Sequence, residues 1–232
     1  MRLLGFTLFA AAVALAAAIG PETTRAEPAP PVDAPVTVVE LFTSEGCSSC
    51  PPADALLAEL GRRDGVLVLG FHVDYWDRLG WKDRFSHAGH TKRQRQYARL
   101  LGERGVYTPQ AVVGGTAGVV GSDREAVEGL LEKATPATVL DVAVEGDTVR
   151  ADAAAGRWVN VAYVRPAAET AVERGENAGR RLAHVNAVVA FASARAVEDG
   201  RVTLALPRPA EGDRLVVYEQ EPSGRITRVA TP

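Results

Sequence analysis

The chain has 232 residues, a formal net charge of −3, and 47% hydrophobic residues. A weakly acidic chain without basic runs gives no electrostatic basis for binding nucleic acid, so that class of partner is excluded. The length indicates one or two domains with an ordinary core, and only two cysteines, Cys47 and Cys50, exclude a small scaffold held together by many disulfides.

The N-terminal segment predicts export. A basic start is followed by an apolar run over residues 3–19 and by small-residue sites that end at Ala18 and Ala26. This is the pattern of a secretory signal peptide, and we place cleavage after Ala26, with residues 1–26 as signal peptide and 27–35 as a Pro-rich, extended leader. An uncleaved anchor is the alternative, because about 17 apolar residues is the lower limit for spanning a bilayer. We expect a periplasmic or secreted protein with no stable membrane insertion after cleavage.

Helical and strand patterns alternate in the first half of the mature chain. The expected elements are strands at 36–43, 66–73, 110–113 and 119–120, and helices at 51–60, 91–103 and from a capping-box pattern at 122–125 to about 134. The strand at 66–73 is almost wholly apolar, as in strands buried on both faces. The order β-α-β-α-β-β-α is that of the thioredoxin core, a small sheet with helices on its faces.

The helical period vanishes after Pro136. Seven short strand patterns separated by Gly, Asp and Pro turns follow, at 139–144, 149–153, 158–164, 185–192, 202–206, 215–218 and 226–229. Such a series predicts an antiparallel sandwich or barrel. We therefore expect an α/β chain with a thioredoxin-like N-terminal domain at 36–135, followed by an antiparallel β-sandwich-like C-terminal domain at 137–232.

Cys47-Ser-Ser-Cys50 stands between the first strand and the first helix, and Pro51 and Pro52 follow it directly. Proline is tolerated in the first turn of a helix, so we expect the helix to start near residues 47–49 with the dithiol at its mouth. The partial positive charge there favours the nucleophilic thiolate. The pattern predicts a redox-active pair in which the more exposed Cys47 reacts and Cys50 resolves the mixed disulfide. A structural bridge and a metal site are the alternatives.

Two other segments supply candidate neighbours of the dithiol. Thr108-Pro109 precedes a strand, and X-Pro bonds take the cis form at modest cost. His72 and Asp74 follow the second strand and, two apart on an extended segment, share a face; Trp76 comes next. A histidine beside a dithiol stabilises a thiolate or moves a proton. An ordinary trans proline, a hydrogen-bonded structural histidine and a packing tryptophan are the structural alternatives.

Glu40 is a candidate proton acceptor in the first strand, seven residues before Cys47. Thioredoxins carry a buried acid in this strand six residues before the first cysteine. Here that position is Leu41, which lies on the opposite face from Glu40 unless the strand is bulged. The assignment to Glu40 therefore depends on such a bulge.

Together these segments resemble a family of exported bacterial proteins, domain of unknown function family 1223, which has a thioredoxin-like fold. The matching residues are 40–54, 72–83, 107–110 and 174–179, so the resemblance covers nearly the whole mature chain. It implies a cis Thr108-Pro109 that faces the Cys47/Cys50 pair and presents backbone groups to a peptide or disulfide partner. It implies little about the substrate.

The leading hypothesis is an exported thiol–disulfide oxidoreductase that acts on protein or small-molecule disulfides and thiols, without a cofactor. A copper carrier using Cys47, Cys50 and His72 is one alternative, because copper accepts Cys and His ligands. Copper-delivery proteins on thioredoxin-like folds have a wider cysteine spacing. A binding module that recognises a partner through residues 173–179, with a vestigial dithiol, is the other. The oligomeric state, the direction of electron flow and the role of the β-rich part are not predicted.

Overall fold

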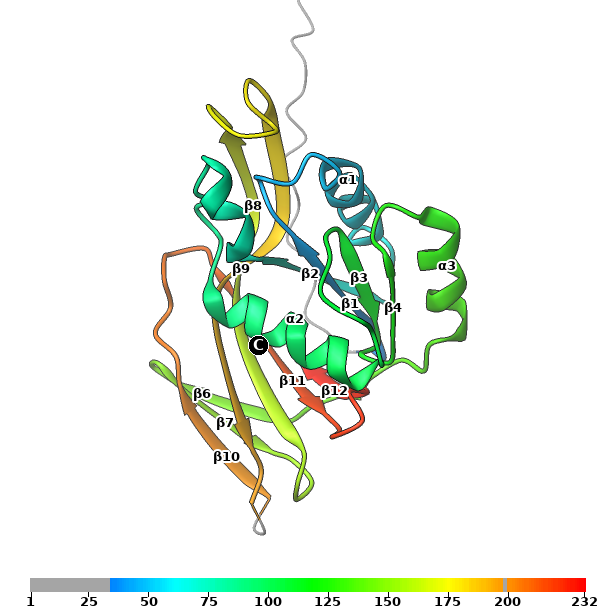
Figure 1. The fold of residues 1–232 in the computed structure, drawn as a ribbon. Coiled ribbons are helices and arrows are strands. Elements are labelled where there is room, and N and C mark those ends of the chain that lie inside the picture. Colours follow the sequence, from blue (N-terminus) through cyan, green and yellow to red (C-terminus); the bar gives the residue numbers. More distant parts are fainter. Residues whose placement is uncertain (1–33, 198–199) are drawn as a thin grey trace, which may run out of the picture.

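The computed structural model describes residues 34–197 and 200–232 (Figure 1). The expected signal peptide, residues 1–26, and most of the leader lie outside the described residues. In the described part, no helix is long and apolar enough to cross a membrane.

Helices and strands alternate in the first half of the described chain, as predicted. The elements are β1 (Thr37–Thr43), α1 (Pro51–Leu60), β2 (Val66–His72), the 3-10 helix η1 (Asp74–Leu79), α2 (Ala88–Leu100), β3 (Gln110–Val113), β4 (Ala117–Val120) and α3 (Arg124–Lys133). The second half is built of strands: β5 (Thr138–Val139), β6 (Val142–Glu145), β7 (Thr148–Asp152), β8 (Trp158–Ala171), β9 (Arg181–Arg195), β10 (Arg201–Ala205), β11 (Arg214–Gln220) and β12 (Ile226–Ala230).

Three helix starts differ from the expectation. α2 begins at Ala88 and not at residue 91, with the side chain of its N-cap His87 accepting a hydrogen bond from the N–H of Gly89. α1 begins at Pro51 with Cys50 as its N-cap, and not at residues 47–49, because prolines fit the first two helical positions, which need no N–H partner. At α3 the capping side chain is Asp123, which accepts a 3.1 Å hydrogen bond from the N–H of Ala126. The mixed α/β class is confirmed.

One nine-stranded sheet runs through both halves, in the order β4-β3-β1-β2-β9-β8-β11-β12-β5. β1 pairs with β2 in parallel and with β3 antiparallel. β2 then pairs in parallel with β9, with Gly70 opposite Ala187. Strands from before and after Pro136 therefore belong to one sheet, and the β2–β9 pair joins the two parts of the chain.

A second, three-stranded sheet, β10-β7-β6, packs against the C-terminal part of the large sheet. Val149 and Val202 of the small sheet share a core with Val161 and Val217 of the large one. Figure 1 shows this sheet at the lower end of the molecule, away from α1. The strands after Pro136 are thus divided between the large sheet and this smaller one.

α1 and α2 cover opposite faces of the first strands. On β1, Leu41 packs with Leu57 of α1, whereas Phe42 packs with Tyr97 of α2. This is the period-2 alternation of a strand buried on both faces. The apolar side chains of β1 therefore alternate between the two helices, and Glu40, which pairs with Arg93 of α2, belongs to the α2 face.

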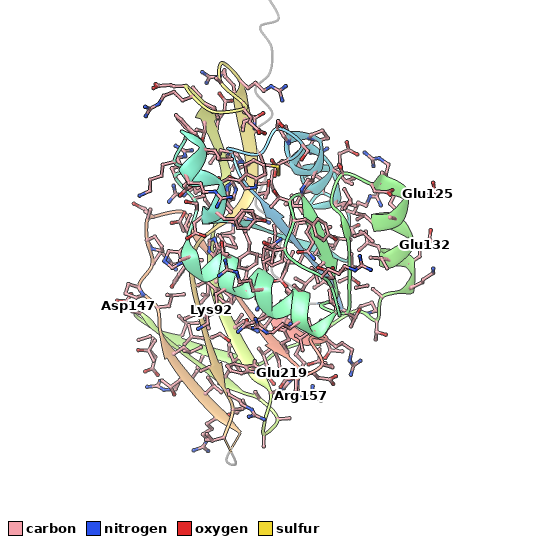
Figure 2. All side chains as sticks on the ribbon, viewed as in Figure 1. Lys92, Glu125, Glu132, Asp147, Arg157 and Glu219 are labelled. Atoms are coloured by element: carbon pink, nitrogen blue, oxygen red, sulfur yellow. A yellow bond between two sulfur atoms is a disulfide. The ribbon has the colours of Figure 1, made fainter. Side chains whose placement is uncertain are left out.

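The end of the large sheet that carries β11 and β12 is held by a charged cluster around Glu219. Its carboxylate accepts a 2.9 Å hydrogen bond from Arg157 and also pairs with Arg228. Burial acts to raise the pKa of Glu219, but hydrogen bonds from Arg228 and Thr227 lower it to about 2. Figure 2 shows Arg157 and Glu219 close together in the lower half of the molecule. This cluster has a structural role and lies far from the cysteines.

Candidate functional site

Cys47 and Cys50 are joined by a disulfide at the N-terminal end of α1. Both cysteine side chains are 0% exposed, whereas Ser48 and Ser49 between them are exposed. The expectation that Cys47 is the more exposed of the two is therefore wrong. Cys47 is buried because another part of the chain covers the disulfide.

The cover is the hairpin tip, residues 172–180, which connects β8 to β9. The side-chain amide of Asn177, itself fully buried, donates hydrogen bonds of 2.9 Å to the carbonyl oxygens of Glu45 and Cys47. The N–H of Ser48 donates to the Glu176 carboxylate at 3.1 Å. Figure 1 shows this tip at the top of the molecule, beside the loop that leads into α1. The segment considered for partner recognition thus lies on the disulfide itself.

The first turn of α1 lacks the N–H groups that usually face a ligand at a helix start. Pro51 and Pro52 have no N–H, and the N–H groups of Ala53 and Asp54 both donate to the carbonyl oxygen of Cys50, at 2.9 and 3.1 Å. The terminus keeps its partial positive charge, but it offers no free donor from these four residues. Stabilisation of a thiolate by this helix is correspondingly smaller than the spacing pattern suggested.

Trp76 links the disulfide loop to the segment before β3. Its indole N–H donates a 2.8 Å hydrogen bond to Oγ1 of Thr108. At the other end, a Cβ added at Gly46 would lie 3.2 Å from Cβ of Trp76, so Gly46 and Trp76 are in tight contact. The residue before Cys47 is therefore small because the tryptophan packs against it.

The Thr108–Pro109 peptide bond is cis, as the family resemblance implied. A Cβ added at Gly121 would lie 3.3 Å from both Cβ of Pro109 and Cβ of Ala53. Pro109 therefore approaches the first turn of α1, with only the backbone of Gly121 between them. The structure thus brings the proline segment to the same end of the sheet as the cysteines.

His72 forms a buried ion pair with Asp83, with 2.6 Å between Nδ1 and Oδ2. The same carboxylate accepts hydrogen bonds of 2.8 Å from the N–H groups of Glu45 and Phe85. Burial acts to lower the pKa of His72, but the charge of Asp83 raises it above its usual value. Burial likewise acts to raise the pKa of Asp83, and the charge of His72 lowers it. These two pKa shifts mean that His72 and Asp83 are both charged in the interior.

A second histidine, His184 of β9, lies against His72 with 4.9 Å between the ring centroids. Its Nε2 is 3.2 Å from Oε1 of Glu45, an ion-pair distance without hydrogen-bond alignment. The other oxygen of Glu45 accepts a 2.8 Å hydrogen bond from the indole of Trp81. Burial acts to raise the pKa of Glu45, but the contacts with His184, Thr170 and Trp81 together outweigh it and lower the pKa.

We call these groups the acid–histidine cluster; its members are Thr43, Glu45, Asp54, His72, Asp83 and His184. Within the described residues, several of its buried polar atoms have no aligned hydrogen-bond partner, among them Oγ1 of Thr43 and both ring nitrogens of His184. Buried polar atoms are usually paired, so this concentration is a physical reason to treat the cluster as part of the candidate site. The cluster gathers at the end of β1 and β2 that carries the disulfide.

Asp74 does not share the face of His72, contrary to the expectation. After Val73 the chain leaves the extended conformation and turns into η1, so the two-residue spacing no longer puts side chains together. The Asp74 carboxylate accepts a 2.5 Å hydrogen bond from Oγ1 of Thr91, and its N–H donates back to that oxygen at 3.2 Å. Asp74 therefore ties η1 to α2.

Glu40 is fully buried on the α2 face of β1, across the sheet from α1. It binds the guanidinium of Arg93 through both oxygens, at 2.7 and 2.9 Å, and it also accepts hydrogen bonds from Tyr97 and Tyr218. No bulge is recorded in β1, whose register with β2 is continuous. This placement assigns Glu40 to a structural network and not to the disulfide.

In residues 34–197 and 200–232, no group of three or more His, Cys, Asp or Glu side chains is arranged to hold a metal ion. Of the three ligands in the copper alternative, Cys47 and Cys50 are bonded to each other, and Nδ1 of His72 is taken by Asp83. No observation favours that alternative over disulfide chemistry.

Sequence reasoning gave no individual role to Glu45, Asp54, Asp83, Asn177 or His184, although the segments 40–54, 72–83 and 173–179 that it singled out contain the first four. Asp54 carried a further signal, because it follows Cys50 by one helical turn and therefore lies on the same helix face. His184 carried none, since it reaches the site only through the pairing of β9 with β2. Long-range strand pairing is not readable from local periodicity.

The family model described as "Protein of unknown function (DUF1223)" matches residues 38–220. A crystal structure of protein AGR_C_4864 from Agrobacterium tumefaciens is 31% identical, with a TM-score of 0.65, over 84% of this chain and 92% of that chain. HBP35 of Porphyromonas gingivalis is 14% identical, with a TM-score of 0.56, over 85% of this chain and 74% of that chain, and is similar in fold alone. A search of curated proteins found no match.

Proposed function

The chain belongs to family DUF1223, and because the description of that family states no activity, we propose a function from the site: a thiol–disulfide oxidoreductase working through Cys47 and Cys50. The observation that carries the proposal is the disulfide at the start of α1, next to the cis Thr108–Pro109 segment. A bridge across so short a loop contributes only about 2 kcal/mol to stability, so a purely structural role accounts for little of the arrangement.

The topology supports a thioredoxin-like interpretation of residues 36–135. The order β1-α1-β2-α2-β3-β4-α3, the parallel β1–β2 pair and the antiparallel β3–β4 pair agree with it. In this interpretation the β-rich residues 137–232 extend the same sheet and supply the hairpin tip over the disulfide. The additional strands then contribute to the site and are not a separate module.

In the reducing direction, the Cys47 thiolate attacks a substrate disulfide, the substrate S–S bond breaks, and one substrate thiol leaves after taking a proton. The Cys50 thiolate then attacks Sγ of Cys47 in the mixed disulfide, the second substrate thiol leaves, and the Cys47–Cys50 disulfide forms. Two electrons pass to the substrate. An external thiol reductant, by the reverse of these steps, restores the dithiol.

The surrounding groups have distinct roles in this proposal. The backbone of Thr108 lines the place where the substrate disulfide binds, and Trp76 positions that segment relative to Cys47. The His72–Asp83 pair holds the loop before α1 through the N–H of Glu45. Since both cysteines are buried, reaction also requires the hairpin tip to move aside. From the N-terminal sequence pattern we further propose that the protein works after export, where dithiols are oxidised.

The proposal is tested by disulfide-reduction assays on the full mature chain, with an insulin-type substrate and a dithiol reductant. Cys47→Ser abolishes turnover and yields no mixed disulfide, whereas Cys50→Ser accumulates a stable mixed disulfide at Cys47. Ser48→Ala is the matched control, since it changes an exposed side chain between the cysteines and keeps both thiols. Wild-type rates in Cys47→Ser would refute the proposal.

A further inference from the structure

Asp54 lies one helical turn beyond Cys50. Cys50 is the N-cap of α1 with helical backbone angles, φ −79 and ψ −35, and the N–H of Asp54 donates to its carbonyl oxygen at 3.1 Å. Side chains four residues apart on a helix lie on one face, neighbouring each other. The carboxyl group of Asp54 and the sulfur of Cys50 therefore face the same side of α1.

That side of α1 faces the acid–histidine cluster. The charges that act on the Asp54 carboxyl group are those of His72 of β2, His184 of β9 and Asp83 of the segment before α2, and the hydroxyl of Thr43 of β1 also acts on it. The two histidines already face carboxylates of their own, at 2.6 Å and 3.2 Å. In the described part of the chain, Asp54 forms no ion pair within 4 Å, so its carboxyl group is the one acid of the cluster not committed to a partner charge.

We propose that the Asp54 carboxylate takes the proton from the Cys50 thiol when Cys50 attacks the mixed disulfide, and gives it back when the disulfide is reduced. This inference rests on the oxidoreductase function proposed above and names its proton acceptor. It assigns the acceptor to the helix that carries the cysteines, whereas Glu40 of β1 is held in the Arg93 network on the other face of the sheet.

The Cys50 S–H bond breaks and its proton passes to Asp54; the sulfur electron pair attacks Sγ of Cys47, and the bond from Cys47 to the substrate sulfur breaks. The substrate thiolate leaves with two electrons and receives a proton from solvent. In the reverse direction an external thiolate attacks Cys47, and the departing Cys50 thiolate receives the proton of the Asp54 carboxyl group.

The protonation equilibrium of Asp54 suits this task. Burial raises the pKa of Asp54 to about 6, against the opposing effect of His72 and His184. A carboxyl group with that pKa is a stronger base than an ordinary aspartate, and it still ionises at neutral pH.

The test follows one turnover step in the full mature chain. Cys47 is loaded with a small thiol as the mixed disulfide, and the release of that thiol by Cys50 is timed between pH 5 and 9. In the wild type we expect an inflection near pH 6, the pKa of Asp54. Asp54→Asn should slow release roughly 10- to 100-fold at pH 7 and move the inflection towards the ordinary pKa of a thiol, about 8.5. Asp54→Glu should keep the inflection.

Glu59→Gln is the matched control, an exposed acid on the same helix, and it should leave both rate and profile unchanged. An active wild type without an inflection near pH 6, or an Asp54→Asn variant with the wild-type rate and profile, overturns this inference alone. The wild-type profile needs no folded variant, so the inference stays testable if Asp54→Asn does not fold. A wild type that releases no thiol at any pH refutes the oxidoreductase function and this inference together.

Discussion

Asn177 reaches across 130 residues of sequence to donate a 2.9 Å hydrogen bond to the carbonyl oxygen of Cys47. A second bond from the same amide, to the carbonyl of Glu45, fixes the hairpin tip over the disulfide. Since each such bond contributes about 1 kcal/mol, Asn177→Ala should make opening of the tip roughly 10- to 30-fold more frequent. The measurement is the rate at which a small phosphine or dithiothreitol reduces the disulfide under native conditions.

Arg174→Ala provides the control for this experiment, because Arg174 lies on the same hairpin tip and is exposed. Its reduction rate should equal that of the wild type. Equal rates for Asn177→Ala and the wild type would mean that the tip does not limit access to the cysteines.

Glu40→Gln should destabilise the fold strongly and leave the disulfide chemistry unchanged. The substitution removes the charged partner of Arg93, whose guanidinium is buried, and unpaired buried charges cost about 3–5 kcal/mol. The free energy of unfolding in urea measures the effect. Glu145→Gln, which breaks the exposed pair with Arg150, should change it by less than about 1 kcal/mol. A changed rate of thiol release in folded Glu40→Gln would instead show that Glu40 takes part in the disulfide chemistry.

Gly115→Ala should be among the most damaging single changes in the chain. Gly115, in the β3–β4 turn, has φ +74, and a Cβ there would overlap the carbonyl oxygen of Gly224 in the β11–β12 turn. The expected loss is about 3 kcal/mol or more in the free energy of unfolding. Gly129→Ala, in the middle of α3 with no atom near the added Cβ, should stabilise by about 0.5–1 kcal/mol. Similar effects at both positions would contradict the close contact.

The His72–Asp83 pair should make stability depend on pH. Against the effect of burial, Asp83 raises the pKa of His72 above its usual value near 6.5, so the native state keeps this proton to higher pH than the unfolded chain. Its contribution is fully present below about pH 6.5 and is lost as the pH rises through the raised native pKa. Urea unfolding of the wild type and His72→Gln should differ most at low pH, with the difference shrinking above pH 7. A constant difference would show that the pair is not charged.

The local elements of this fold were predictable because their signals are local. The proline pair marks the start of α1, and the apolar run of Val66–His72 marks a strand buried on both faces. The pairing of β2 with β9 was not predictable, because one register contact between Gly70 and Ala187 joins segments with unrelated patterns.

The residues of the candidate site show the same difference between local signals and long-range pairing. The Cys47–Cys50 pair was picked out by its spacing, Thr108-Pro109 by the family resemblance, and Asn177 only as part of the segment 173–179. His184 was not picked out, since its position follows from the β2–β9 pairing, and Asp74 was misplaced because the turn into η1 after Val73 leaves no strong sequence signal.

The most direct test of the central claim is the reduction potential of the Cys47–Cys50 disulfide, obtained by equilibrating the native chain with thiol–disulfide buffers of known potential. Redox-active dithiol proteins span about −120 to −270 mV. The prolines that remove donors from α1 and the carboxylates of Asp54 and Glu176 disfavour the thiolate, so we predict the lower part, about −200 to −270 mV. A value below about −300 mV, typical of structural disulfides, would contradict the proposed oxidoreductase.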